Sequence, residues 1–154
     1  MAGYKEGEAR ILDLVQSLTH FNTTNSAIGD WTILNSGESD EYAILKPGEH
    51  GDPEYITMRT YRAYWKTVIE VWWFWNIGES DTDNLQFLED RAQEVIDGLQ
   101  PYRKTNDSGG TVLHAEIGPI GPVNEIKNQD GGMEWLMQEV TFGWDEEISV
   151  TFEE

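Results

Sequence analysis

The chain has 154 residues, of which 38% are hydrophobic and 25% are charged. This length fits one domain, which we assign to residues 1–154, and it permits a hydrophobic core without metals or disulfides. The composition is too apolar for a disordered chain and too polar for a membrane protein. Cysteine is absent, which excludes disulfides, zinc–thiolate sites and a thiol nucleophile.

The charge is strongly negative and unevenly distributed. Asp and Glu number 29 against 10 Lys and Arg, so the net charge is −19. Residues 1–77 carry 11 acids and 6 bases, a net of −5, and residues 78–154 carry 18 acids and 4 bases, a net of −14. Phosphates are bound mainly by lysine and arginine, so we expect this surface to repel DNA. The acidic residues either keep the protein soluble or form a surface along which nucleic acid passes without binding.

Membrane association is not expected. No apolar stretch is long enough to span a bilayer, and no apolar region follows Lys5 to form a signal peptide. The negative charge also disfavours binding to anionic membranes.

The first periodic segment, Glu8–Leu18, is expected to be a helix. Its apolar residues recur so that they share one helical face. They are Ile11, Leu14, Val15 and Leu18. Two short strands are predicted next, at Trp31–Asn35 and Tyr42–Lys46, with polar turns around them.

The longest extended segment is Tyr55–Trp75, in which alternate residues differ in character. One face holds most of the apolar residues, and the other begins polar and ends in Trp72 and Phe74. Alternate side chains of a strand point to opposite faces, so we expect the first face to be buried. The segment is long for a single strand, and a bend or break is expected near Thr60–Tyr64.

A second helix is predicted over Asp83–Leu99. The turn Asp81–Asn84 provides capping residues and acids, which are favoured at the positive end of a helix. Pro101 bars continuation. The apolar stripe fits either a helix that packs on one face of a sheet or the seam of a coiled coil. We favour packing on a sheet, because the stripe is short. Its members are Leu85, Leu88, Ala92, Val95 and Leu99.

The rest of the chain is predicted to hold strands and one long connection. Strands are expected at Thr111–Ile117, Glu134–Trp144 and Glu146–Phe152, and Gly118–Gly132 is expected to be irregular because it repeats Gly-Pro. The order of elements predicts an α+β fold. It consists of an antiparallel-rich sheet covered by two helices, with a long irregular loop before the last strands.

No motif in the sequence identifies an enzyme. His114 and Glu116 fit a ligand or acid–base pair, but a solvated strand face is the favoured explanation. Asp81 and Asp83 lack the further ligands of a calcium loop, so helix capping is favoured. Neither a nucleophile elbow nor a phosphate-binding loop is found. We expect no catalytic residue, no cofactor and no metal site.

Seven tryptophans are the unusual feature of the composition. The run Trp72–Trp75 places aromatic side chains on both faces of one strand end. Trp72 and Phe74 point away from the face that a helix covers, so they need a second layer, a partner subunit or a ligand. Large aromatic residues dominate interface energetics. A subunit interface that includes Trp72, Phe74 and Trp75 is favoured over a platform for sugar stacking.

With these elements in this order, the chain resembles the tail terminator, or tail-completion, proteins of long-tailed bacteriophages. The resemblance covers about residues 5–150 and is one of pattern. The matching features are an amphipathic N-terminal helix, short strands, the long strand Tyr64–Trp72, the helix Asp83–Leu99, and a Gly/Pro loop with Gly131-Gly132 before a last long strand that ends in Asp145, Glu146 and Glu147. The chain departs from the family pattern in its tryptophan density and in the length of its loop at 118–132.

The resemblance implies a structural protein and not an enzyme. Proteins of this family form a hexameric ring that caps the tail tube, stops its polymerisation and docks the tail to the head. The partners implied are further copies of the chain, the tail tube protein and a head–tail connector or neck protein. DNA passes through the ring's channel without specific binding, and the ring belongs to the virion tail or neck after assembly in the host cytoplasm.

In such a ring, Trp72 and Phe74 are candidates for the heterologous contact that closes it. The loop 118–132 and the strand 146–152 are candidates for ordering against tube or neck subunits, with Ile148, Val150 and Phe152 pairing at a sheet edge. Two alternatives stay open. One is another phage neck or head–tail joining subunit, and the other is a Trp-rich carbohydrate-binding module.

Overall fold

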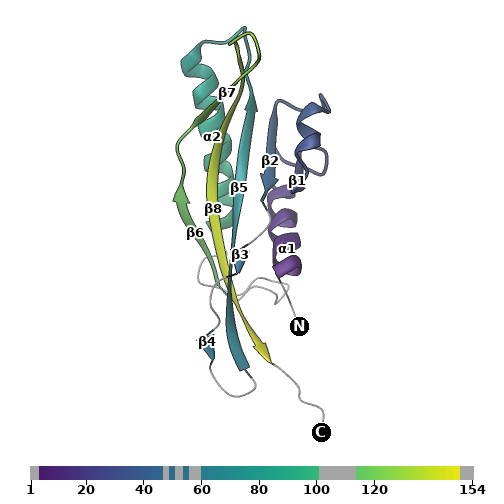
Figure 1. Cartoon of the computed structure of the whole chain (residues 1–154), viewed down its shortest axis with the longest axis vertical. Helices are drawn as coiled ribbons and strands as arrows, with labels where there is room; N and C mark the ends of the chain where they lie inside the picture. Colours follow the sequence, from purple (N-terminus) through teal and green to yellow (C-terminus); the bar gives the residue numbers. More distant parts are fainter. Residues whose placement is uncertain (1–3, 47–48, 51–53, 56–59, 101–113, 150–154) are drawn as a thin grey trace.

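A computed structural model of the chain describes residues 4–46, 49–50, 54–55, 60–100 and 114–149. It is an α+β structure with two α-helices and a mixed sheet (Figure 1). The elements in chain order are α1 (Tyr4–Gln16), β1 (Ser26–Ile28), the 3₁₀ helix η1 (Trp31–Asn35), β2 (Glu41–Leu45), β3 (Glu49–His50), β4 (Glu54–Tyr55), β5 (Thr60–Phe74), α2 (Asp81–Leu99), β6 (His114–Ile120), β7 (Asn124–Lys127) and β8 (Met133–Ser149).

The sheet is built around two long strands. Its strand order is β1-β2-β5-β8-β6, with β3 and β4 also paired to β5 and β7 paired to β8. β5 and β8 are antiparallel from the pair Thr60–Ser149 to the pair Phe74–Trp135. They run side by side along the long axis of the molecule (Figure 1). The pair β1–β2 is parallel, so the sheet is mixed although most of its pairs are antiparallel, as predicted.

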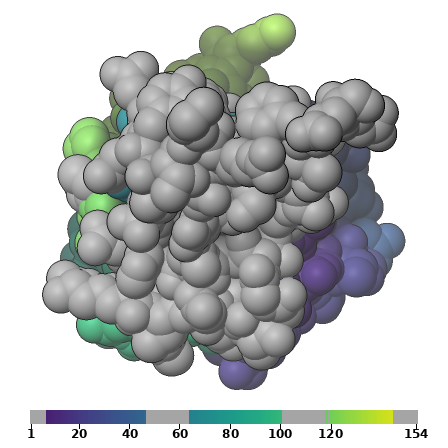
Figure 2. Space-filling view, turned by 90° about the horizontal axis from the view of Figure 1, so that it is seen from below, coloured from purple at the N-terminus to yellow at the C-terminus, as the bar shows by residue number. Residues whose placement is uncertain are grey.

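Both helices pack on one face of the sheet, which we call the helix face. Ile11 and Val15 of α1 and Leu88 of α2 share one buried cluster with Ile69 and Val71 of β5. Seen from below, residues of the N-terminal part of the chain, in purple and blue, lie at one flank of the molecule, and light green residues from the part after 117 lie at the opposite flank (Figure 2). The residues that alternate with Ile69 and Val71 point to the other face, which we call the open face.

The two predicted helices are confirmed, with shifted starts. α2 begins at Asp81, and its N-cap is Ser80, whose side chain accepts a 3.1 Å hydrogen bond from the Asp83 amide. The predicted stripe is buried except for Leu85, which is 37% exposed. Asn84 is fully buried in the position predicted for Leu85, because its side chain accepts a hydrogen bond from Trp73 near the end of β5. Each helix lies within the described ranges, and neither is long and apolar enough to cross a membrane.

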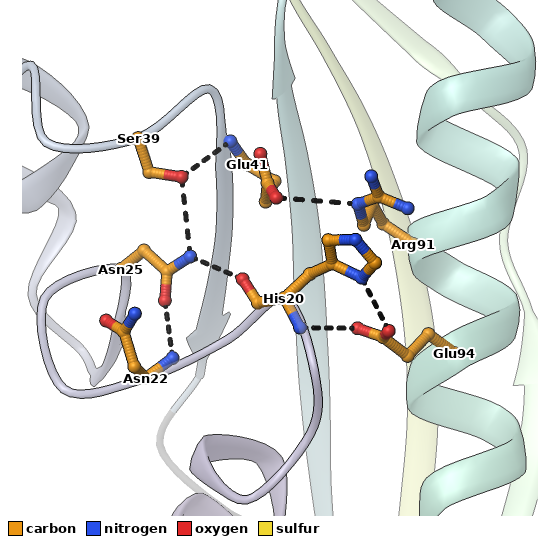
Figure 3. A network of polar contacts seen from close by, with 7 residues as sticks. All are labelled: His20, Asn22, Asn25, Ser39, Glu41, Arg91 and Glu94. Carbon is orange, nitrogen blue, oxygen red and sulfur yellow. Dashed lines mark hydrogen bonds and ion pairs between the residues drawn. The ribbon is translucent and has the colours of Figure 1, made fainter.

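A polar network joins the segment after α1 to α2 (Figure 3). The Nδ1 atom of His20 lies 2.7 Å from Glu94 Oε1 on α2, and the side chain of Asn25 donates to the His20 carbonyl at 2.7 Å. Nearby, Arg91 Nε lies 3.5 Å from Glu41 Oε1 at the start of β2. These contacts fix β1 and β2 against the helix layer, although the residues are distant in sequence.

The prediction of a strand at Trp31–Asn35 is wrong, because this segment is the 3₁₀ helix η1. Asp30 caps it, with Oδ1 accepting a 3.0 Å hydrogen bond from the Thr32 amide. Trp31, one of the apolar residues that suggested a strand, is held by a hydrogen bond from its Nε1 to Glu70 on β5.

The bend or break predicted near Thr60–Tyr64 does not interrupt the pairing of β5. β5 runs without interruption from Thr60, whereas β4 ends at Tyr55 and pairs back onto β5 through Tyr61. The alternation predicted for β5 is confirmed in its last part, since Ile69, Val71 and Trp73 are buried on the helix face, whereas Trp65 and Trp75, predicted on the same face, are only partly buried.

The irregular loop predicted at Gly118–Gly132 is wrong as well. β6 extends to Ile120, and β7 occupies Asn124–Lys127, because both find backbone partners on β8. The two last strands predicted, Glu134–Trp144 and Glu146–Phe152, form one strand, β8, that runs to Ser149. The acids that suggested a break after Trp144 do not interrupt its pairing with β5.

Candidate functional site

The open face carries a cluster of aromatic side chains, which we call the aromatic face. Register places Tyr42 of β2 beside Trp72 of β5, and Phe74 beside Trp135 of β8. Phe74 is 44% exposed, and Trp31 of η1, which lies at the border of the cluster, is 40% exposed. The aromatic face is made of Trp31, Tyr42, Trp72, Phe74 and Trp135.

Trp135 is the centre of the cluster. Its ring centroid lies 5.0 Å from that of Phe74, 5.9 Å from that of Trp72 and 5.8 Å from that of Tyr42. All three pairs are edge to face, with interplanar angles of 75°, 87° and 69°. Such pairs contribute about 0.5–1.5 kcal/mol each to stability beyond the area they bury, so the rings hold one another in fixed positions.

The carboxylate of Glu70 holds two of these tryptophans. Its Oε1 atom accepts hydrogen bonds from Trp31 Nε1 at 2.6 Å and from Trp72 Nε1 at 3.3 Å. Glu70 is only 5% exposed, and a buried carboxylate is costly unless it is paired and hydrogen-bonded. Lys46 provides the opposite charge, with Nζ 3.5 Å from Glu70 Oε2.

Lys46 links Glu70 to Glu139 across the open face. Its Nζ atom donates a 3.1 Å hydrogen bond to Glu139 Oε1. This hydrogen bond is the main reason why the pKa of Lys46 is raised above 10.5; partial burial opposes the rise, and the charges of Glu139 and Glu70 add to it. Lys46 therefore stays protonated at neutral pH and anchors the polar border of the aromatic face.

The segment around η1 covers the outer part of the open face. The Tyr42 hydroxyl accepts a 3.1 Å hydrogen bond from the Ser39 amide and lies 3.2 Å from Ser36 Oγ. Tyr42 is fully buried as a result. The part of the open face over β5 and β8 is where Trp72 and Phe74 reach solvent.

The predicted interface residues do not form one group. Trp72 and Phe74 lie together on the aromatic face, as the alternation predicted. Trp75 follows β5 and packs against the core on the helix face, so it is separated from them by the sheet. Ile148 pairs with Tyr61 inside the sheet. Val150 and Phe152 lie outside the described residues.

Trp31, Trp135 and Glu70 are members of the site that the sequence pattern does not predict. The sequence pattern predicts a strand at Trp31. The place of Trp135 depends on the pairing of β5 with β8. Glu70 is a charged residue, and charged residues are ordinarily expected on the solvent-exposed surface. Only the structure brings the three together, through pairings between residues far apart in the chain.

A groove on the helix face forms a second surface. It lies between α2 and the β7–β8 hairpin and has a volume of about 600 Å³. Its lining combines apolar and charged side chains. They are Trp75, Asp81, Thr82, Leu85, Glu89, Val123, Glu125, Lys127, Gly131, Met133 and Leu136.

The other candidate residues of the sequence form no site in the described part of the chain. Asp81 and Asp83 lie in the first turn of α2, near its positive end as predicted, but neither of them caps the helix, because the N-cap is Ser80. His114 and Glu116 belong to β6. Within the described ranges, no three His, Asp or Glu side chains gather where they could hold a metal ion.

The chain matches no protein-family model, and a search of curated proteins finds no match to its sequence. Its function is therefore inferred from the aromatic face, the distribution of acids and the groove.

Proposed function

We propose that the chain is a structural subunit of a bacteriophage tail, a tail terminator that forms a hexameric ring at the end of the tail tube and joins the tail to the head or neck. The observation that carries the proposal is the aromatic face, with Phe74 44% and Trp31 40% exposed. In the ring, this face contacts the neighbouring copy. The tail tube protein and a neck or connector protein are the further partners, and the ring takes its place in the virion after assembly in the host cytoplasm.

An exposed aromatic surface of this kind suits a subunit contact. Contiguous exposed apolar surface is uncommon on monomers and marks interaction sites, and aromatic residues provide much of the binding energy at interfaces. The Glu70 carboxylate and the edge-to-face contacts of Trp135 hold the rings in place before contact. A rigid surface loses little side-chain entropy on association, which favours a contact that recurs between all copies.

The acids of α2 support a channel for DNA. Arg91, the single basic residue of α2, lies against Glu41, so it does not offset the exposed acids. Where these exposed carboxylates border the channel of the ring, they repel DNA phosphates, so that the genome passes without binding. The exposed acids of α2 are Asp81, Asp83, Glu89, Asp90 and Asp97.

The alternatives differ in what they predict. Another neck or head–tail joining subunit uses the same surfaces, and only the site of assembly separates it from a terminator. A carbohydrate-binding module needs flat ring faces open to the sugar. Here Trp135 is 7% exposed and meets Trp72 and Phe74 edge to face, which makes the cluster a poorer platform for stacking.

Light scattering at several protein concentrations tests the proposal. Moderate salt is needed to screen the repulsion between acidic subunits. We expect a species of about 106 kDa, which is six times the chain mass of 17.6 kDa, and a central hole in electron micrographs of that species. A monomer at every concentration, with tryptophan fluorescence that shifts on adding glycans, contradicts the ring and favours the carbohydrate-binding module.

A matched pair of variants tests the aromatic face itself. Phe74→Ser removes an exposed ring of the cluster, and Ile77→Ser removes a side chain that is 91% exposed in the turn after β5. We expect Phe74→Ser to lower the assembled fraction and Ile77→Ser to leave it unchanged, because only Phe74 belongs to the contact. If both variants assemble like the unchanged chain, the aromatic face is not the subunit contact.

A further inference from the structure

The groove beside α2 exists because the sheet extends beyond the helix that covers it. α2 packs over β5 and β8, while β7 continues the sheet past β8 and forms the far wall of the groove. Register places Glu125 beside Leu136 on the helix face. The groove is therefore a gap in the helix layer, open to a further segment of polypeptide.

The floor and one wall of the groove are apolar. Leu85 is 37% exposed here. The neighbouring Asn84 occupies the buried position at the start of the apolar stripe, so Leu85 lies outside the core. Trp75, Val123 and Met133 are only partly buried and pack on the core from the groove side. An apolar side chain that enters the groove would find the contacts that Leu85 lacks.

The rim of the groove is acidic. Asp81, Glu89 and Glu125 surround it, against one base, Lys127. Among the residues that the structure describes, none forms an ion pair with these four side chains. The local potential is negative, as is the chain as a whole at −19. Complementary charge favours a basic occupant and disfavours a second copy of this acidic chain.

We propose that this groove binds an extended segment of a different protein, one that presents an apolar side chain next to lysine or arginine. The volume of about 600 Å³ lies within the range of pockets that enclose small ligands, so it suits the side chains of a segment and not the face of a folded domain. Within the proposed function, on which this assignment rests, the segment belongs to the tube or neck protein. The aromatic face then contacts other copies of this chain, and the groove binds the tube or neck protein.

Fluorescence anisotropy with short labelled peptides tests the groove. The probe is a peptide that alternates leucine and lysine, and its two matched peptides replace leucine by serine or lysine by glutamate. We expect only the leucine–lysine peptide to bind the unchanged chain. Leu85→Ser is expected to weaken that binding about tenfold, because the leucine side chain loses an apolar contact, and Glu89→Gln with Glu125→Gln is expected to weaken it and to reduce its salt dependence.

The control double variant also removes two carboxylates, both from a part of α2 outside the groove. Asp90 and Asp97 line a second groove of about 560 Å³ beside α1, so Asp90→Asn with Asp97→Asn is expected to leave peptide binding unchanged. Equal loss in both double variants, binding of the serine–lysine peptide, or no binding to the unchanged chain overturns the proposal. Light scattering of the same variants reports ring formation separately, so failure of the groove and failure of the ring are distinguishable.

Discussion

The indole Nε1 of Trp73 donates a 3.0 Å hydrogen bond to Oδ1 of Asn84, and this bond fixes the start of α2 to the end of β5. Asn84 Oδ1 also accepts from the Asn76 amide at 2.9 Å, and its Nδ2 donates to the carbonyls of Asn76 and Ser80 at 2.9 and 3.0 Å. One buried side chain thus satisfies both the indole and the backbone of the turn between the two elements.

Asn84→Ala is expected to lower the free energy of unfolding by about 2–4 kcal/mol, because the buried indole and the Asn76 amide both lose their acceptor. Urea unfolding measures the loss. Ser80→Ala is the control, since it removes only the N-cap bond to Asp83 and is expected to cost about 1 kcal/mol. Similar losses for the two variants would contradict the special role of Asn84.

Glu70→Gln is expected to destabilise the fold by about 1–3 kcal/mol, because Lys46 loses a partially buried charge partner and the two indoles lose an ionised acceptor. Near-ultraviolet circular dichroism is expected to change as well, since Trp31 and Trp72 lose their fixed orientation. Glu139→Gln is the control. The Glu139 side chain is 34% exposed, so its loss is expected to cost less than about 1 kcal/mol.

Lys46 is expected to make stability fall in strongly alkaline solution. Its pKa in the folded chain is raised above 10.5, mainly by the hydrogen bond to Glu139, so folding favours the protonated form. The stabilisation is fully present below 10.5 and is lost as the pH rises through the folded pKa. Urea midpoints between about pH 9 and about pH 12 measure it. Lys46→Arg stays charged and is expected to lose less over this range; coincident curves would exclude Lys46 as the cause.

Gly7→Ala is expected to destabilise the fold, although alanine is ordinarily the better helix former by about 1 kcal/mol. A Cβ atom at Gly7 would lie 2.5 Å from Trp144 Nε1. The Trp144 ring is 3% exposed and stacks on Trp65 with centroids 6.5 Å apart, so it has little room to move. Overpacking of this kind costs about 1–3 kcal/mol. A rise in the thermal midpoint of this variant would show that α1 packs less closely on β8.

The parts of the fold that depend on local pattern could be predicted. Both helices followed from apolar spacing, and the buried face of β5 followed from alternation. The 3₁₀ helix at Trp31–Asn35 could not be predicted, because its tryptophan is held by Glu70 on a strand distant in sequence. β7 could not be predicted either, because it lies in a Gly/Pro-rich segment and is a strand only through its pairing with β8.

The candidate site was predictable only where one strand determines it. Alternation alone placed Trp72 and Phe74 together on one face. The same alternation places Trp75 on the opposite face, so grouping it with Trp72 and Phe74 was wrong. Alternation could not add Trp135, whose position depends on the register of β5 with β8. Asn84 shows the same limit in the helix, because a polar residue in an apolar stripe position is buried only when its partners, here Trp73 and Asn76, are known.

The position of β8 in the sheet has a consequence for biosynthesis. β8 is the last strand of the described chain, yet it lies between β5 and β6 in the strand order. While the ribosome is still translating β8, one edge of β5 has no partner, and the side chains of α2 that later pack on β8 are uncovered. Pairing between strands so far apart in sequence is slow. The unpaired edge of β5 is therefore open to aggregation until β8 has left the ribosome and paired with it.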